Sequence, residues 1–275
     1  ATKSAMAPKQ FHYAGALAIL SSVFAKYAFL PINVQRMSLN LYFLVLGRTT
    51  QSRKSTSLRL AEGIMRDVAI GVGKGTDSYI APEDSTGEAL SAYLRTKPKE
   101  SGLYAIDEVQ DFFAHAAQRG SYMSSMMPFL TKSYDGYIPA VARKDKGGKV
   151  AYQTATPYYM TFYGTGILDQ SAKHLTKERV ESGFTPRCLV VVDERDHYIT
   201  SSQDVKLVAV NPSTGKIADK QRDFMLSNLI RATTKFDTHF SARQSRSLAH
   251  EEVRIPVEFE PGVFERWIEF SEEAK

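Results

Sequence analysis

The sequence predicts an α/β fold in which one sheet of buried strands carries helices on both faces. Two observations lead to this prediction. Short, almost wholly apolar runs rich in Val, Leu and aromatic residues are typical of central strands buried on both sides, and such runs occur at residues 38–46, 103–106, 158–163 and 188–193. Segments with apolar residues at helical spacing lie between these runs, and that alternation favours a sheet covered by helices.

The composition is that of a globular protein with one large core. The chain has 275 residues, of which 43% are hydrophobic, enough for one core or for a core with an appendage. The net charge of +5 and the pI of about 9.1 permit a polyanionic partner without requiring one. Cys188 is the single cysteine, so no intrachain disulfide can form and a reducing, cytoplasmic compartment is expected.

No membrane span is expected, because no apolar run reaches the roughly 18 residues that a span needs. The nearest stretch, residues 13–30, is interrupted by Ser21, Ser22 and Lys26. The chain begins at Ala1 without an initiator methionine and ends just as a helical pattern at 263–274 begins. We therefore expect a piece of a longer polypeptide.

The chain divides into three expected parts. Residues 1–37 form a polar tail and a helix at 11–29, residues 38–210 form the core with its sheet, and residues 211–275 form a C-terminal extension with a helix at 219–235 and a strand at 253–259. Within the core, the apolar spacing predicts helices at 55–68, 86–95, 109–119, 123–134 and 167–181. Two strand-like segments, 137–143 and 149–154, flank a turn containing Gly147 and Gly148 and predict a β-hairpin insertion.

Residues 47–56, GRTTQSRKST, lie between the first expected strand and the first core helix. We call them the phosphate loop, because they follow the pattern in which a glycine, four residues and a second glycine precede Lys and Ser or Thr. In that pattern backbone N–H groups surround phosphate, the Lys reaches the terminal phosphates and the hydroxyl holds magnesium. Lys54 and Ser55 have these positions, and the remaining nucleotide-binding candidates are Gly47, Thr50, Gln51, Ser52, Arg53 and Thr56.

The phosphate loop departs from the pattern at two places. Arg53 replaces the glycine before the Lys, and Gly47 stands one place earlier than expected. A side chain at position 53 is acceptable only if its φ is negative or if backbone strain is tolerated. The alternative interpretation is a surface loop rich in Ser, Thr and Arg that caps a helix.

Two carboxylates, Asp107 and Glu108, follow the apolar run at 103–106; we call them the acidic tip. A carboxylate at the end of such a strand can position magnesium, and a second can orient and deprotonate water. Asp107 is thus the second metal candidate beside Ser55, and Glu108 is the candidate catalytic base. The alternative is an ordinary helix N-terminus, where acidic residues are favoured in any case.

Thr165 and Arg187 are two further candidates. Thr165 follows the run at 158–163, where a hydroxyl can contact the attacking water or the γ-phosphate; the alternative is a helix cap. Arg187 precedes the run at 188–193, where a guanidinium can stabilise transition-state charge in its own site or in a neighbour's. Its alternative is a surface ion pair with Asp193 or Glu194.

Four cations crowd the turn of the expected hairpin: Arg143, Lys144, Lys146 and Lys149. Such cations can meet the phosphates of single-stranded nucleic acid, and Tyr137 and Tyr152 beside them can stack on bases. The alternative is an edge hairpin that lysines keep soluble.

Several stretches together resemble a family of P-loop ATPases of phages and mobile elements, known mainly as a domain of unknown function beside primase modules. The resemblance spans most of residues 13–195, and the ending RKST is a variant associated with this family. The stretches are LYFLVLGRTTQSRKST (41–56), STGEAL (85–90), GLYAIDEVQDFF (102–113), YDGYIPAVARK (134–144), YGTGILDQSAKHL (163–175) and SGFTPRCLVV (182–191).

The resemblance implies a P-loop NTPase fold, RecA-like or AAA+-like, that uses ATP and Mg²⁺ as a replicative DNA helicase or translocase. A basic P-loop domain with an arginine candidate also suggests a homo-oligomeric ring, a hexamer, with a fused or associated primase. Two other classes stay open. One is a nucleotide-gated helicase loader or defence switch, and the other is a nucleic-acid-binding module whose loop, altered at Arg53, no longer binds nucleotide.

Overall fold

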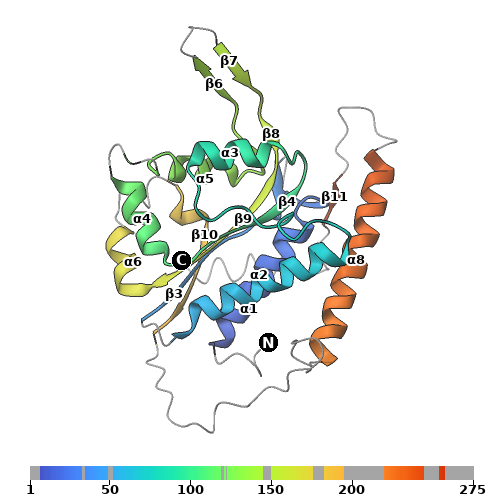
Figure 1. Ribbon diagram of the computed structural model, residues 1–275, viewed down its shortest axis with the longest axis horizontal. Coiled ribbons are helices and arrows are strands. Elements are labelled where there is room, and N and C mark those ends of the chain that lie inside the picture. Colours follow the sequence, from blue (N-terminus) through green and yellow to red (C-terminus); the bar gives the residue numbers. More distant parts are fainter. Residues whose placement is uncertain are drawn as a thin grey trace.

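The chain folds as a mixed α/β protein around a parallel sheet, as expected (Figure 1). The computed structural model describes residues 7–32, 35–48, 52–118, 121, 123–144, 150–175, 183–194, 220–244 and 254–257. Thr50, Gln51, Lys146 and Lys149 lie outside these ranges, as do the segments 195–219 and 258–275.

The four apolar runs all become strands of one parallel sheet, with the strand order β10-β3-β9-β4. The prediction that the run at 188–193 is buried on both sides is wrong, because this run forms a strand at the edge of the sheet, where Leu189, Val190 and Val192 are exposed. The strands are β3 (Tyr42–Gly47), β4 (Ser101–Ile106), β9 (Tyr159–Ile167) and β10 (Cys188–Asp193). Ile80 adds a parallel bridge to Leu103 beside β4. The third run is longer than the sequence predicted, because β9 continues to Ile167 and places Thr165 inside the strand opposite Val45.

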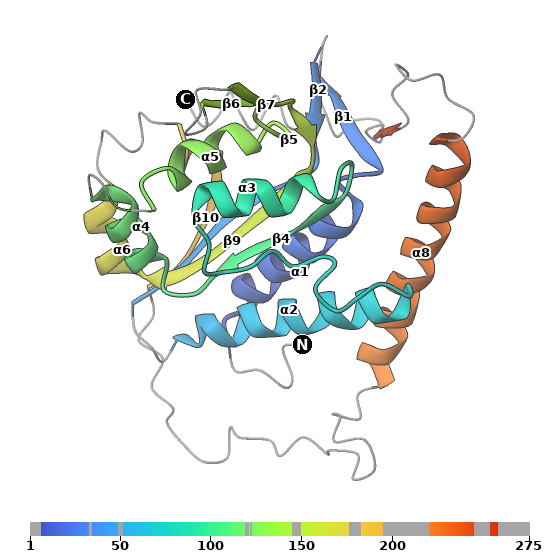
Figure 2. The ribbon, with the colours of Figure 1, turned by 45° about the horizontal axis from the view of Figure 1, so that its top comes forward.

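Helices cover both faces of this sheet (Figure 2). Successive residues of a strand point to opposite faces, so the alternate residues of β3 serve two cores. Tyr42, Leu44 and Leu46 pack with the side that holds α3 (Gly87–Arg95), α4 (Val109–Ala117) and α5 (Met126–Ser133). Phe43 and Val45 pack with the side that holds α1 (Lys9–Phe24) and α2 (Lys54–Gly71). Among the residues that the structure describes, the core also contains α6 (Leu168–His174) and the 3₁₀ turn η2 (Thr185–Arg187).

The helix predicted at residues 11–29 is present, but its predicted C-terminal end is wrong. α1 stops at Phe24, and residues 28–32 form β1 (Ala28–Ile32), which pairs with β2 (Gln35–Ser38) and β11 (Ile255–Pro256). The distant segment at 254–257 supplies backbone donors to Tyr27 and Phe29, so pairing with remote residues outweighs the local helical spacing. In the described part of the chain, no helix combines the length and apolarity needed to cross a membrane.

The predicted hairpin is confirmed in the backbone. β6 (Val141–Lys144) pairs antiparallel with β7 (Val150–Gln153), and β5 (Tyr137–Ile138) pairs with β8 (Thr156–Pro157) at its base. Pro139, which lacks an N–H, separates β5 from β6. The hairpin projects from the body of the molecule (Figure 1), and the side chains of Arg143 and Lys144 lie outside the part that the structure describes.

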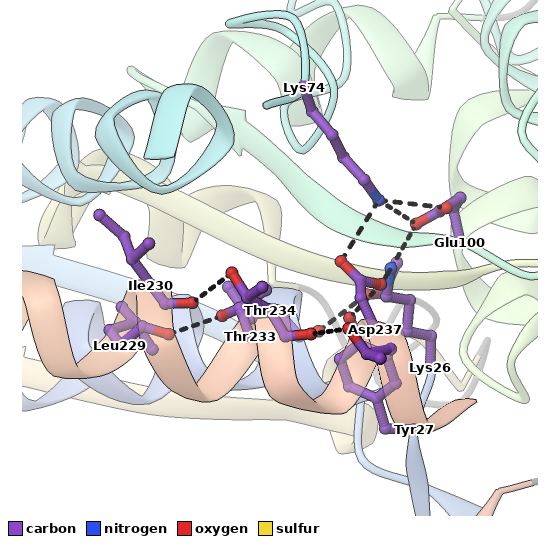
Figure 3. Close-up of polar contacts among 12 residues, drawn as sticks. Lys26, Tyr27, Lys74, Glu100, Leu229, Ile230, Thr233, Thr234 and Asp237 are labelled. Atoms are coloured by element: carbon purple, nitrogen blue, oxygen red, sulfur yellow. Dashed lines mark hydrogen bonds and ion pairs between the residues drawn. The ribbon is translucent and has the colours of Figure 1, made fainter. Parts of the chain in front are cut away.

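A charge cluster joins the C-terminal helix α8 (Lys220–Gln244) to the core (Figure 3). Lys26, only 2% exposed, binds Glu100 at 2.8 Å and Asp237 of α8 at 3.0 Å. Lys74, which follows α2, lies 3.3 Å from Glu100, and the Tyr27 hydroxyl donates to Asp237 at 2.5 Å. The cluster therefore ties four separate segments together.

The cluster keeps its ionised form despite burial. Burial alone would lower the pKa of Lys26, but the charge of Glu100 raises it above its usual value. Burial likewise opposes ionisation of Asp237, yet the hydrogen bond from Tyr27 and the charge of Lys26 hold the pKa of that carboxyl below its usual value. The ionised Asp237 carboxylate therefore contributes fully to the free energy of unfolding at pH values above the usual Asp pKa. This contribution is lost as the pH falls through the lowered pKa of Asp237 in the folded protein.

Replacing Lys26 by Met is expected to destabilise the fold, because it removes the more deeply buried of the two lysines that contact both Glu100 and Asp237. We expect a loss of about 3 kcal/mol in the free energy of unfolding, measured by urea denaturation. The control is Arg66→Met, which removes the 3.7 Å pair to Glu62 on the surface of α2 and should cost only about 0.5 kcal/mol. Equal losses in the two variants would contradict an anchoring role for Lys26.

Candidate functional site

The carboxyl ends of the four parallel strands meet at one edge of the sheet. Gly47 ends β3, Asp193 pairs with it at the end of β10, and Asp107 follows β4. In open α/β sheets ligands bind in the crevice outside these ends. We call this the carboxyl edge and the other the amino edge.

The described residues of the predicted phosphate loop on either side of 49–51 lie close together at the end of β3. A Cβ placed on Gly47 would lie 2.3 Å from Ser52 Oγ, so only glycine permits this approach. Lys54 is the first residue of α2, is 6% exposed, and donates from Nζ to Ser52 Oγ at 3.1 Å. Burial lowers the pKa of the Lys54 ammonium, and the charge of Asp107 opposes part of that shift.

Of the two possibilities that the sequence left open at position 53, a negative φ or a strained backbone, the structure shows the strained backbone. The φ of 53° and ψ of 38° of Arg53 are left-handed, a conformation that costs a residue with a Cβ about 1–2 kcal/mol. Among described non-glycine residues, Arg53, Lys99 and Glu108 have positive φ. Two of these three flank the carboxyl edge, and strain of this kind is concentrated at functional sites.

Asp107 is the point at which separate segments converge. Its Oδ1 accepts hydrogen bonds from Ser55 Oγ at 3.0 Å, Thr165 Oγ1 at 2.6 Å and the Glu108 backbone N–H at 3.1 Å. The predicted meeting of Ser55 with Asp107 is therefore present in the structure. Thr165 holds Asp107 instead of capping a helix, because Ile167 occupies the N-cap of α6.

Ser55 and Asp107 fit a magnesium ion. Mg²⁺ prefers oxygen ligands and is usually held by one or two protein groups together with phosphate oxygens and water. A hydroxyl and a carboxylate oxygen that already lie 3.0 Å apart at the start of α2 supply such a pair. Glu108 beside them is exposed and N-caps α4 with φ 53°.

Two acidic residues at this edge were missed from the sequence. Asp193 is 2% exposed at the end of β10. The sequence pattern that pointed to Asp107, an acidic residue at the end of an apolar run, is also present at Asp193. Glu83 Oε1 accepts the Asp107 backbone N–H at 3.1 Å. It lies in a polar loop whose local pattern carries no such signal.

Arg187 lies at the amino edge, directly before β10. The six residues of β10 separate it from the carboxyl edge by about 20 Å. Its Nη1 donates to the Gly183 carbonyl at 2.6 Å, and its guanidinium lies 5.6 Å from the centre of the Tyr134 ring. A role in its own site would need a large movement. The alternative pairing with Asp193 or Glu194 is wrong, because both lie at the far end of the strand.

Thr56 lies in the first turn of α2, next to Ser55 at the carboxyl edge, and is exposed. The hairpin leads through β8 into the start of β9 and is therefore attached at the amino edge. Tyr152 and Tyr137 on the hairpin are 67% and 39% exposed, so their rings are accessible.

Replacing Arg53 by Gly should stabilise the protein by about 0.5–1 kcal/mol, because relief of left-handed strain exceeds the added entropy of the unfolded chain. The measurement is urea denaturation. Arg53→Ala controls for the lost charge and should show no such gain. Gly73→Ala is the reverse control, since Gly73 has φ 73° with nothing within 4 Å of an added Cβ, and it should destabilise. A gain from Arg53→Ala equal to that from Gly would assign the effect to charge.

No protein-family model matches this chain, and a search of the curated proteins finds no match for it.

Proposed function

We propose that this chain is a magnesium-dependent ATPase of the P-loop class. One observation carries the proposal: Ser55 from the predicted phosphate loop and Asp107 from the acidic tip meet at 3.0 Å beside the buried Lys54. Two independent sequence motifs thus converge at the edge where α/β sheets bind ligands. The position of β9 between β3 and β4 supports the RecA-like or AAA+-like form of this fold, because it brings Thr165 into the same site.

Each residue has a role that its position supports. Lys54 would bind the β- and γ-phosphates, and Gly47, Ser52 and Arg53 with Thr50, Gln51 and Thr56 would surround them with backbone N–H groups. Ser55 and Asp107 would hold Mg²⁺, which when bound neutralises charge on the phosphates. Thr165 fixes the Asp107 carboxylate, and Glu108, next in sequence, would accept the proton of the attacking water.

Arg187 suits a neighbour's site better than its own, given its place at the amino edge. This supports a homo-oligomeric ring, a hexamer, in which each Arg187 would approach the ATP of an adjacent subunit. The projecting strands of the hairpin (Figure 1), with the four cations that the sequence places around its turn, support a single-stranded DNA partner. The full proposal is a cytoplasmic replicative helicase or translocase of a phage or mobile element that works with a primase. The alternative is a nucleotide-gated loader or defence switch, which would assemble on ATP without unwinding.

The Glu108→Gln variant should bind ATP as the wild type does but hydrolyse it about 10²–10⁴-fold more slowly, because the base is lost while phosphate and metal contacts remain. Binding is measured by calorimetry and turnover by phosphate release. Asp111→Asn, an exposed acid in the first turn of the same helix, is the matched control and should keep full turnover. Full turnover in Glu108→Gln would remove this residue from the role. Absence of ATP binding by the wild type would end the ATPase proposal.

Reversing Lys144 and Lys146 to Glu should weaken binding of single-stranded DNA and flatten its salt dependence. Each phosphate contact contributes about 0.7 to the slope of log affinity against log salt concentration. Basal ATPase without DNA should persist, and stimulation by DNA should vanish. The control reverses Lys9 and Lys173, which are exposed on α1 and α6, and should alter neither slope nor stimulation. An unchanged slope in the hairpin variant would assign the cations to solubility or to subunit contact.

A further inference from the structure

We propose that residues 83–95, which we call the linking segment, couple the acidic tip to the hairpin. The inference rests on the proposed function and adds how its two sites communicate. One end of the linking segment contacts Asp107 at the carboxyl edge, and the other end holds both strands of the hairpin at the amino edge.

At the carboxyl edge the contact is made by Glu83. Its Oε1 accepts the Asp107 N–H at 3.1 Å, and its own carbonyl accepts from the Tyr104 hydroxyl at 3.3 Å. The preceding residues run beside β4, where the Leu103 N–H donates to Tyr79 and the Ala81 N–H to Leu103. Glu83 is thus a positioning residue that acts through the backbone of the acidic tip.

The middle of the linking segment is a short, well-anchored helix. Thr86 caps α3 by accepting the Ala89 N–H at 3.1 Å. Leu90 and Leu94 are fully buried in the core. A Cβ on Gly87 would lie 2.8 Å from Ser125 Oγ, so the start of α3 packs closely against the start of α5. A helix of nine residues spans about 13 Å.

At the amino edge the contact is made by Arg95, the last residue of α3. Its guanidinium donates to the carbonyl of Pro139 on one side of the hairpin and to that of Thr154 on the other. It also donates to Thr156 Oγ1 at 3.1 Å. One planar group therefore links both strands, a geometry that the single ammonium of Lys cannot reproduce.

Binding of a ligand at the acidic tip is expected to displace the linking segment. Glu108 is held at φ 53°, next to the residue that Glu83 contacts. Metal and phosphate at Asp107 change the interactions that maintain this strained turn, and a ligand shifts an equilibrium only through such differential contacts. Coupling between two binding sites is reciprocal. If bound nucleotide changes the affinity of the hairpin for nucleic acid by some factor, bound nucleic acid changes the affinity for nucleotide by the same factor. Couplings of this kind are typically about 5–150-fold.

The experiment measures amide hydrogen exchange of hairpin residues 150–157 with and without Mg-ATP. The background is full-length Glu108→Gln, which prevents turnover. We expect ATP to change their exchange rates by about 5-fold or more, and we expect that change to disappear when Arg95→Met or Arg95→Lys is added. Calorimetry confirms that each variant still binds ATP, and circular dichroism confirms that it is folded. Lys97→Met is the matched control, because Lys97 bonds to Asp77 and Tyr93 and makes no hairpin contact among the described bonds.

Variants of Glu83, at the other end of the linking segment, test the same proposal if the Arg95 variants do not fold. Glu83→Ala removes the acceptor for the Asp107 N–H and should abolish the ATP-dependent change, whereas Glu83→Gln keeps an acceptor oxygen and should preserve it. An ATP-dependent change that persists in Arg95→Met or in Glu83→Ala would overturn the proposal, as would bound ATP without any change in the hairpin. Failure of both the wild type and the Glu108→Gln protein to bind ATP would instead reject the ATPase function itself.

Discussion

The carboxylate of Asp107 is the interaction on which the candidate site depends. One oxygen accepts hydrogen bonds from the start of α2, from the interior of β9 and from the following backbone N–H. These segments come together only because β9 lies between β3 and β4 in a parallel sheet. A charge-assisted bond is roughly twice as strong as a neutral one. The same oxygen therefore fixes the relative positions of the predicted phosphate loop, the acidic tip and Thr165.

The carboxyl edge combines rigid strands with strained turns. β3 and β4 are buried along their whole length, and this supports left-handed backbone at Arg53 and Glu108 on either side of the site. Buried packing of that kind can hold conformations that cost about 1–3 kcal/mol each. For the phosphate and metal of the proposed function, such a site would be pre-organised, because its donors and carboxylates would need little rearrangement on binding.

The molecule separates its expected tasks between the two edges of the sheet. The phosphate loop and acidic tip lie at the carboxyl edge, whereas the hairpin and Arg187 lie at the amino edge about 20 Å away. Elements that cross the sheet must therefore connect them, and the linking segment, residues 83–95, does so with polar contacts at both of its ends. At the amino edge, Glu100 and Lys26 also attach α8, so the C-terminal helix is joined to the start of the strand that ends at the acidic tip.

The sequence by itself determined the strands of the sheet and the residues that follow them, because these depend on local pattern. Continuous apolar runs favour strands, and Lys54, Ser55, Asp107 and Glu108 could be named from their places beside such runs. The same pattern could not tell that the run at 188–193 lies at the exposed edge of the sheet, because strand order is decided by the tertiary structure. Tertiary structure alone decided the rest. Strand order placed Thr165 against Asp107 and carried Arg187 to the opposite edge, while pairing with residues 255–256 turned the end of an expected helix into β1. The proposed roles of Glu83 and Arg95 depend on contacts with residues 24 and 44 or more positions away in the sequence. No local pattern encodes such contacts, because only the folded sheet brings these segments together.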